Sequence, residues 1–354
     1  MPHTYRVREI AAQAGLSPAT VDRVLHARGG VRASTVREVE QAVADLDRQQ
    51  AQLRIGTRTS MVDVVVQAPA RFSGGVRAAM EAELPTLRPA VVRARFHLHE
   101  GGSPGDVVAA LGRVGRGRTD GVVLKAPDVP EVVDAVAALD ARGVPVVTLA
   151  TDLPTSARVA YVGADNRAAG ATAAYLVHQW AGRPHGSGRA DPTVVLVVRG
   201  RSSSRGEDER EMGFRATLRE LAPAARALEV VDDEEDAGAV RRAVDAALAE
   251  RPDVGAVYSL YAGAGGNGAV LAALDAAGRR CPVVAHDLDG ENVDLLRRHR
   301  LSAVLHHDLR QDVRRACHAL LRADGHLPGP VRSGTSAVTV VTPYNLPRSV
   351  LATP

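Results

Sequence analysis

One glycine-rich hexapeptide has the spacing of a nucleotide-binding loop. It is GAGGNG, residues 263–268, which follows the apolar run Ala256–Ser259, and Asp287 stands about twenty residues further on. Such glycines let a backbone approach a pyrophosphate at a helix N-terminus, while a carboxylate at the end of the next strand binds ribose. The hexapeptide alone therefore predicts an NAD-dependent oxidoreductase, an alternative to weigh against the rest of the chain.

Histidine, cysteine and serine residues form no comparable pattern. His97 and His99 are two residues apart on one apolar run, and Cys317–His318 has no second pair at the spacing of a zinc site. No serine occupies the G-x-S-x-G sequence of a nucleophile elbow. We therefore expect no metal, no cofactor and no catalytic residue.

Positive charge is concentrated at the start of the chain. The 354 residues have a formal net charge of +3, and the segment up to Ser60, with its nine arginines and six acidic residues, accounts for all of it. Two cysteines are too few for a disulfide framework, and no apolar run reaches the ~18 residues that span a bilayer. The N-terminus lacks the apolar stretch of a secretory signal. These features predict a cytoplasmic protein without membrane contact.

Three short helices are predicted before residue 49. Apolar residues recur at helical spacing from Val7 up to Gly15, which ends the first helix. Ser17 is a suitable N-cap, followed by proline at the first helical position, for a second helix that reaches Leu25. A third helix follows from about Ala33. No alternating β-branched run interrupts this segment.

The first two helices and their turn, Arg8–His26, have the order of a helix-turn-helix. Such a unit presents the start of its second helix to base edges and phosphates, and Arg23 is placed to pair with a guanine or a phosphate. A small three-helix unit without this role has the same periodicity, so spacing alone leaves both open. The candidate DNA-binding residues here are Arg6, Ser17, Pro18, Ala19, Thr20, Arg23, His26 and Thr35.

After Ser60, apolar runs alternate with amphipathic stretches of helical period. Strand–helix alternation with continuous apolar strands is typical of parallel sheets covered on both faces, and ten strands favour two lobes over one sheet. The predicted strands are Val62–Val66, Val91–Phe96, Gly121–Leu124, Val144–Leu149, Val159–Val162, Val194–Val198, Leu228–Val231, Ala256–Ser259, Pro282–His286 and Ala303–His306. The predicted helices include Gly75–Leu84, Pro130–Arg142, Arg167–Trp180, Glu211–Leu221, Ala237–Ala249 and Gly268–Gly278.

Residues 10–46 closely resemble the head of the lac repressor/galactose repressor family of transcriptional regulators. Asp22 departs from that pattern, since the family often has Ser or Asn there. Relatives insert a leucine of a hinge helix into the minor groove, a role for which Leu53 is the nearest candidate, although Gly56 shortens any helix. The matching residues are Ala11, Ala14, Gly15, Ser17, Thr20, Val21, Arg23, Val24, Val31, Thr35 and Val39.

The body resembles the same family at three motifs: DNRAAG at 165–170, REMGF at 210–214 and AHDLD at 285–289. The resemblance implies a small all-α helix-turn-helix head, residues 1–48, and a hinge or linker, 49–60. It further implies an α/β two-lobed body, 61–354, like a type I periplasmic binding protein with Rossmann-like parallel sheets. The lobes are expected to comprise 61–163 with 304–336, and 164–303 with 337–354.

This family resemblance also implies an effector cleft. Arg210 matches the arginine that grips sugar hydroxyls, Asp287 ends a strand at the cleft, and Phe72 suits a sugar ring as well as it suits the core. Ala150 stands where the family often has a ligand carboxylate. The candidate ligand-binding residues are Phe72, Lys125, Asp152, Arg210, Ser259, Asp287 and His307.

The expected function is that of a ligand-responsive repressor of a carbohydrate or polyol catabolic operon. By analogy with the family, we expect a homodimer on near-palindromic, double-stranded operator DNA, paired through helices near Gly75–Leu84 and Asp308–Leu321. A monosaccharide or polyol is the expected effector. An exported sugar-binding protein shares the body but has no use for residues 1–50, and an oxidoreductase rests on one hexapeptide.

Overall fold

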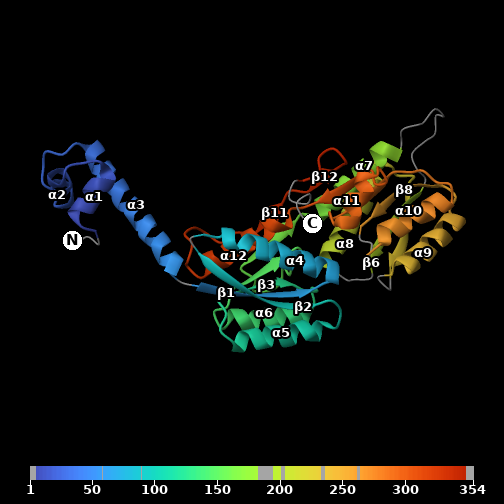
Figure 1. Cartoon of the computed structure of the whole chain (residues 1–354), viewed down its shortest axis with the longest axis horizontal. Coiled ribbons are helices and arrows are strands. Elements are labelled where there is room, and N and C mark those ends of the chain that lie inside the picture. Colours follow the sequence, from blue (N-terminus) through green and yellow to red (C-terminus); the bar gives the residue numbers. More distant parts are fainter. Residues whose placement is uncertain are drawn as a thin grey trace.

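The computed structural model describes residues 5–57, 59–88, 90–181, 194–200, 204–232, 236–260 and 264–347, and of residues 48–57 only the backbone. A small helical head lies at one end of the molecule and is joined by a single helix to a two-lobed body (Figure 1). In the described residues, no helix is long and apolar enough to cross a membrane.

The head consists of α1 (Val7–Ala14), α2 (Pro18–Leu25) and the first turns of α3 (Ala33–Thr57). All three helices bury apolar side chains in one small core, in which Ile10, Val21 and Val39 are at most 1% exposed. Gly15 ends α1 in the left-handed conformation, with φ of 66°, which glycine adopts without a steric penalty. The three predicted helices are therefore present.

Helix α3 is longer than the sequence indicates. It continues through Gly56 to Thr57, where the sequence predicts a linker and a shortened helix, and strand β1 begins at Thr59. The glycine costs about 1 kcal/mol of helix propensity relative to alanine, so the helix continues here against a local preference. The side chain of Leu53 lies outside the described residues, so its predicted minor-groove role stays a prediction.

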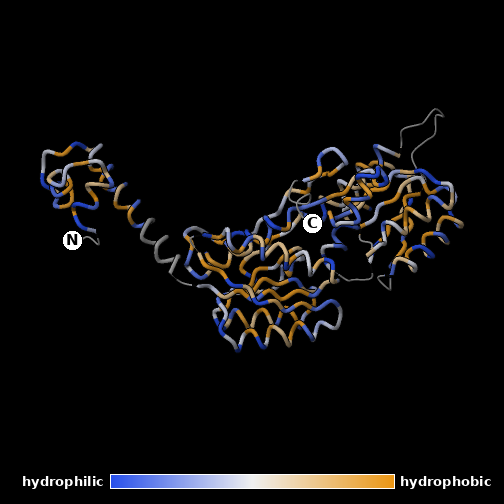
Figure 2. Tube along the Cα trace, viewed as in Figure 1, coloured by the Kyte–Doolittle hydropathy of each residue, from blue (hydrophilic) through white to orange (hydrophobic). Residues whose placement is uncertain are grey.

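The first lobe is built on a sheet of six parallel strands in the order β11-β5-β4-β3-β1-β2. Valine-rich runs form its central strands, which are coloured as hydrophobic in Figure 2, and helices cover both faces of the sheet, where buried apolar residues form two clusters. The strands are β1 (Thr59–Gln67), β2 (Val91–His99), β3 (Gly121–Lys125), β4 (Val146–Leu149), β5 (Ala160–Ala164) and β11 (Gly334–Ser336). The helices are α4 (Ala70–Glu83) with η1 (Leu84–Thr86) and α12 (Leu309–Ala323) on one face, and α5 (Pro104–Arg116) and α6 (Pro130–Asp140) on the other.

The second lobe repeats this architecture with the order β12-β10-β9-β8-β6-β7, in which only β12 is antiparallel to its neighbour. Its strands are β6 (Val194–Gly200), β7 (Arg226–Asp232), β8 (Val254–Ser259), β9 (Val283–His286), β10 (Ala303–His306) and β12 (Thr339–Val341). Helices α7 (Asn166–Ala181) and α8 (Arg205–Leu221) cover one face, and α9 (Ala237–Glu250), α10 (Gly266–Ala276) and α11 (Gly290–Arg297) cover the other.

In its described residues, the chain passes between the lobes three times: after β5, after β10 and between β11 and β12. Strand β10 belongs to the second sheet, so the observed passage follows His306, whereas the predicted lobe boundary at residue 304 lies inside this strand. All ten predicted strands are present. The short strands β11 and β12 are additional.

Candidate functional site

The head presents the start of α2 to solvent. The hydroxyl of Ser17 accepts a hydrogen bond from the backbone N–H of Thr20 at 3.2 Å, which caps the helix, and Pro18 occupies its first position. Val21 faces the head core. The capped end of α2 is thus held outward on a short, rigid helix, which is the geometry of a recognition helix.

The predicted DNA-binding residues of the head form two groups by exposure. Arg6, Ser17, Pro18, Ala19, Arg23 and His26 are exposed, whereas Thr20 and Thr35 are half-buried. The carboxylate of Asp22 accepts from Arg28 at 3.0 Å and lies 3.0 Å from the His26 ring. Because Arg28 compensates its charge, this carboxylate opposes an approaching phosphate less than the sequence suggests.

A cavity of about 670 Å³ lies between the two lobes of the body. It is formed by the carboxyl ends of the strands and the amino ends of helices, where open α/β sheets bind their ligands. Its ionisable and polar lining residues are Gln67, Arg71, Glu100, Lys125, Thr151, Asn166, Ser204, Glu207, Arg210, Asp287, Asp289, His306 and His307.

Phe72 and Lys125 form part of the first-lobe wall of the cavity. Phe72 lies in the first turn of α4, and Lys125 ends β3, with its Nζ 5.0 Å from the centre of the phenyl ring. Burial lowers the pKa of Lys125, and the charge of Arg210 acts in the same direction, against Glu207. The ammonium group therefore gains from any ligand acceptor that replaces its lost hydration.

Arg210 lies in the second-lobe wall and is held in place by the packing of α7 against α8. Its Nε donates to Asn166 Oδ1 at 2.8 Å, and its guanidinium lies 3.7 Å from the Asp287 carboxylate. The two helices touch through glycines: a Cβ added at Gly170 would lie 1.8 Å from the carbonyl oxygen of Arg210, and one at Gly213 would lie 2.0 Å from that of Arg167. The glycines of DNRAAG and REMGF thus permit the approach that places Arg210.

Asp287 follows β9 with a φ of 63°, a left-handed conformation that is uncommon for a residue other than glycine. Burial raises the pKa of its carboxyl group, but the charges of Arg210 and His307 outweigh burial, so the pKa lies below its usual range. The carboxylate is therefore a charged acceptor at neutral pH. Such strain at the mouth of a cavity is typical of functional positions.

His307 connects the cavity to the passage between the lobes. Its Nε2 lies 3.9 Å from the Asp287 carboxylate, and its Nδ1 is 2.7 Å from that of Asp312, which is fully buried. Ser336, at the end of β11, donates to the same Asp312 carboxylate. The site thus contacts two of the three inter-lobe passages.

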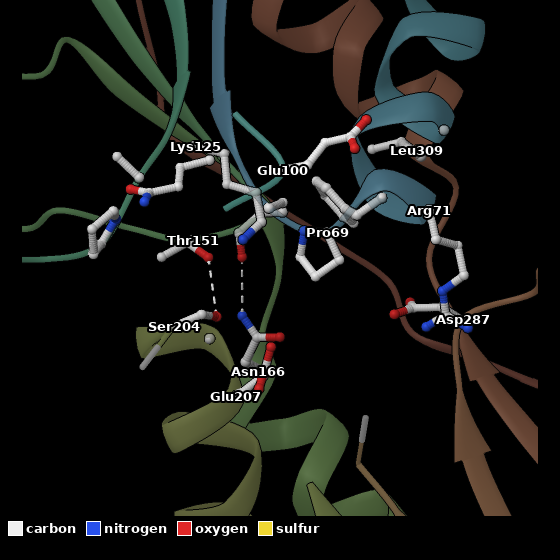
Figure 3. Close-up of a pocket in the computed structure, with 18 of the residues that line it drawn as sticks. Pro69, Arg71, Glu100, Lys125, Thr151, Asn166, Ser204, Glu207, Asp287 and Leu309 are labelled. Atoms are coloured by element: carbon white, nitrogen blue, oxygen red, sulfur yellow. Dashed lines mark hydrogen bonds between the residues drawn. The ribbon is translucent and has the colours of Figure 1, made fainter. Parts of the chain in front are cut away.

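Several contacts bridge the cavity from one lobe to the other. The hydroxyls of Thr151 and Ser204 lie 3.5 Å apart, and Asn166 Nδ2 donates to the carbonyl oxygen of Ala150 at 3.3 Å (Figure 3). Arg71 of α4 pairs with Asp289 of the second lobe. Outside the cavity, Arg205 donates to Asp128 at 2.9 Å. All of these bridging contacts except Arg205–Asp128 thus involve groups that line the cavity, where a ligand can reach them.

Two of the predicted ligand-binding residues do not line the cavity. Asp152 forms a bidentate ion pair with Arg158, and Ser259 is buried at the end of β8. The other five, Phe72, Lys125, Arg210, Asp287 and His307, all line it. Four further lining residues were not predicted from the sequence: Arg71, Asn166, Glu207 and Asp289. Asn166 belongs to the DNRAAG motif and Asp289 to the AHDLD motif. All four residues lie in the first turn of a helix or directly before it.

The glycine-rich hexapeptide has a structural role in its described part, 264–268. The carboxylate of Glu291 accepts from the backbone N–H groups of Gly265 and Gly268, at 3.2 and 2.7 Å. These are N–H groups that a pyrophosphate needs at a helix N-terminus, and they are already bound to an anion. None of the residues 264–268 lines the inter-lobe cavity.

Comparison with known families assigns both parts of the chain. Residues 6–47 match the model "Bacterial regulatory proteins, lacI family", and residues 103–325 match the model "Periplasmic binding protein domain". None of the curated proteins compared with the chain matches it in sequence.

Solved structures share the fold of the body. The glucose-galactose binding protein GanP of Geobacillus stearothermophilus is 19% identical, with a TM-score of 0.68 over 82% of this chain and 99% of that one. A putative LacI transcriptional regulator from Bacteroides fragilis is 17% identical, with a TM-score of 0.68 over 81% and 97%. A carbohydrate transporter from Acidothermus cellulolyticus in complex with myo-inositol is 18% identical, with a TM-score of 0.68 over 83% and 96%. With its lacI-type head and its periplasmic-binding-protein domain, the chain belongs to the lacI family of bacterial regulatory proteins.

Proposed function

We propose that the protein is a repressor of a carbohydrate or polyol catabolic operon, whose effector binds in the inter-lobe cavity and changes operator affinity. Two heads of a homodimer occupy adjacent half-sites of a near-palindromic operator. The observation that carries the proposal is a lacI-type helical head joined through α3 to a lobe that forms one wall of a charged cavity.

The lining chemistry favours a polyhydroxylated ligand. Lys125 and Arg210 supply donors and Asp287 supplies a charged acceptor, so neighbouring hydroxyls can donate to one group and accept from another. Phe72 offers an apolar surface to the C–H face of a sugar ring. The solved relatives in complex with sugars and with myo-inositol support the same ligand class.

Effector binding acts on the lobes through the bridging contacts. A ligand between Arg210 and Lys125 contacts both lobes, and its affinity therefore depends on the angle between them. Only this difference in affinity between lobe arrangements can shift the operator-binding state. Because α3 enters β1 directly, a rotation of the first lobe carries the head with it.

A thermal-shift screen of monosaccharides and polyols tests the cavity. We expect one of them to raise the melting temperature of the wild-type chain, and Arg210→Ala to remove that rise. Arg226→Ala, at an exposed position of β7 in the same lobe, is the matched control and should retain it. An unchanged response in Arg210→Ala would refute the proposed ligand site.

DNA retention tests the head separately. Arg23→Ala should abolish the retention of duplexes that the wild-type chain selects from a random-sequence pool, because it removes a donor from the exposed face of α2. The same variant should keep the wild-type thermal shift with effector. Sequence-specific retention by Arg23→Ala at wild-type strength would contradict the assignment of α2 as the recognition helix.

A further inference from the structure

The first lobe carries arginines along the edge of its sheet that is opposite to the cavity. Because its strands are parallel and their carboxyl ends line the cavity, their amino ends share the far edge, where α3 joins β1. Arg88, Arg118, Arg142 and Arg332 lie in the connections that enter β2, β3, β4 and β11. All four are exposed, and none pairs with an acidic group of the described residues.

Several other arginines of this lobe are paired with acidic groups, whereas Arg93 and Arg113 are exposed and have no acidic partner in the described residues. Arg95 forms a bidentate pair with Asp63, and both Arg310 and Arg314 bind the buried carboxylate of Glu83. Arg158, which precedes β5, is paired with Asp152. Among the described arginines in the connections that enter the strands of this sheet, the four named above are therefore the ones without an acidic partner.

The acids that lie near this edge do not pair with the four arginines. Asp120 accepts from the backbone N–H of Met61 at 2.7 Å, and Asp324 lies 3.0 Å from the ring of His326. Arg116 and Arg322 end α5 and α12 at the same edge, where the helix dipoles favour a cation. Arg88, Arg118 and Arg142 directly follow the C-caps of η1, α5 and α6, so a helix dipole favours them as well, whereas Arg332 lies well beyond the end of α12 along the chain.

We infer that Arg88, Arg118, Arg142 and Arg332, the basic edge, contact the phosphate backbone of the DNA to which the head binds. The edge is the end of the body at which the head is attached (Figure 1), and only residue 58 separates α3 from β1. A guanidinium without a protein partner offers its full fork of donors to a phosphate. The inference rests on the proposed operator binding by the head and adds the body to the DNA interface.

The salt dependence of binding measures these contacts. The probe is a duplex selected from a random-sequence pool by the full chain and extended by flanking sequence on both sides. The variant Arg88→Gln/Arg118→Gln/Arg142→Gln/Arg332→Gln should make the slope of log K against log salt less negative by up to about 3.6 per protomer, because each phosphate contact contributes about 0.9. Specificity among selected sequences should not change, since phosphates carry no sequence information.

A second variant controls for net charge. Arg226→Gln/Arg242→Gln/Arg280→Gln/Arg298→Gln removes the same charge from exposed positions of the second lobe, and it should keep the wild-type slope. Equal slopes in the wild type and the basic-edge variant, or equal changes in the two variants, would overturn the inference. A different outcome would identify the basic edge as a surface for an acidic protein: the wild type is retained on polyglutamate, the basic-edge variant alone is not, and the salt slope of DNA binding is the same in both. If the wild-type chain retained no duplex, the proposed function itself would fail.

Discussion

Gly213→Ala tests whether the close packing of α7 and α8 places Arg210, the cavity-lining arginine that we propose as an effector ligand. The added Cβ would lie 2.0 Å from the carbonyl oxygen of Arg167, whereas real Cβ atoms essentially never come within 3.0 Å of another heavy atom. The helices must therefore separate by about 1 Å, which the dense packing of an interior resists. Overpacking of this kind costs about 1–3 kcal/mol of unfolding free energy.

The same displacement reaches the cavity. Asn166 belongs to α7 and Arg210 to α8, and their hydrogen bond is 2.8 Å long. A separation of about 1 Å would lengthen it to roughly 3.8 Å, beyond hydrogen-bond distance. Gly213→Ala should therefore lower both the stability of the second lobe and the effector-induced thermal shift, although residue 213 does not line the cavity.

Urea unfolding followed by tryptophan fluorescence provides the assay, because Trp180, the single tryptophan, lies on α7. Gly290→Ala is the matched control: its Cβ would meet no atom within 4 Å, at the exposed start of α11 in the same lobe. That control should gain about 0.4–1 kcal/mol from the lower entropy of the unfolded chain. A Gly213→Ala midpoint equal to or above that of the wild type would refute the packing argument.

Three further outcomes are expected. Ser17→Ala should destabilise the head by about 1 kcal/mol in calorimetry, because it removes the N-cap of α2, and an unchanged head transition would contradict this. Burial holds the pKa of His286 well below its usual value, so when the pH is lowered below about 6.5 the unfolded chain binds a proton at this histidine and the folded chain does not. The free energy of unfolding therefore decreases as the pH is lowered. His286→Gln should reduce this slope by up to about 1.4 kcal/mol per pH unit, and an unaltered pH profile would refute the argument. Arg205→Gln breaks the ion pair with Asp128 across the lobes and should increase the radius of gyration measured by X-ray scattering. Arg215→Gln, whose acidic partners lie within one lobe, should leave that radius unchanged. Equal radii of gyration in the wild type and both variants would exclude an effect of the Arg205–Asp128 pair on lobe closure.

Most of the fold could be predicted from the sequence, because its signals are local. Valine-rich runs such as Val62–Val66 predict buried parallel strands whatever packs on them. Strands β11 and β12 have three residues each, too short for a periodic signal, and only pairing with β5 and β10 makes them strands. The continuation of α3 past Gly56 likewise opposes a local preference.

The site was predictable where one residue follows a recognisable strand. Lys125 is the last residue of β3 and Asp287 directly follows β9, and both line the cavity. Arg71 and Glu207 lie in the first turns of α4 and α8, and they line it only because the two lobes face each other. Asp152 also follows a strand, but Arg158 binds its carboxylate. The end of a predicted strand thus indicates where a residue lies, whereas its hydrogen-bond partners and the orientation of the lobes are known only from the folded chain.

The triple passage between the lobes determines how this molecule can be divided and recombined. The head ends at a single joint between Thr57 and Thr59, so one crossover there can graft a different DNA-reading unit onto the same sensor. Neither lobe is a continuous piece of chain, and exchange of the second lobe requires three simultaneous crossovers, one at each passage. Truncation before β11 would remove an edge strand from both sheets at once. New operator specificities are therefore accessible by simple gene fusion, whereas new sensors of this architecture must arise by substitution within the cavity.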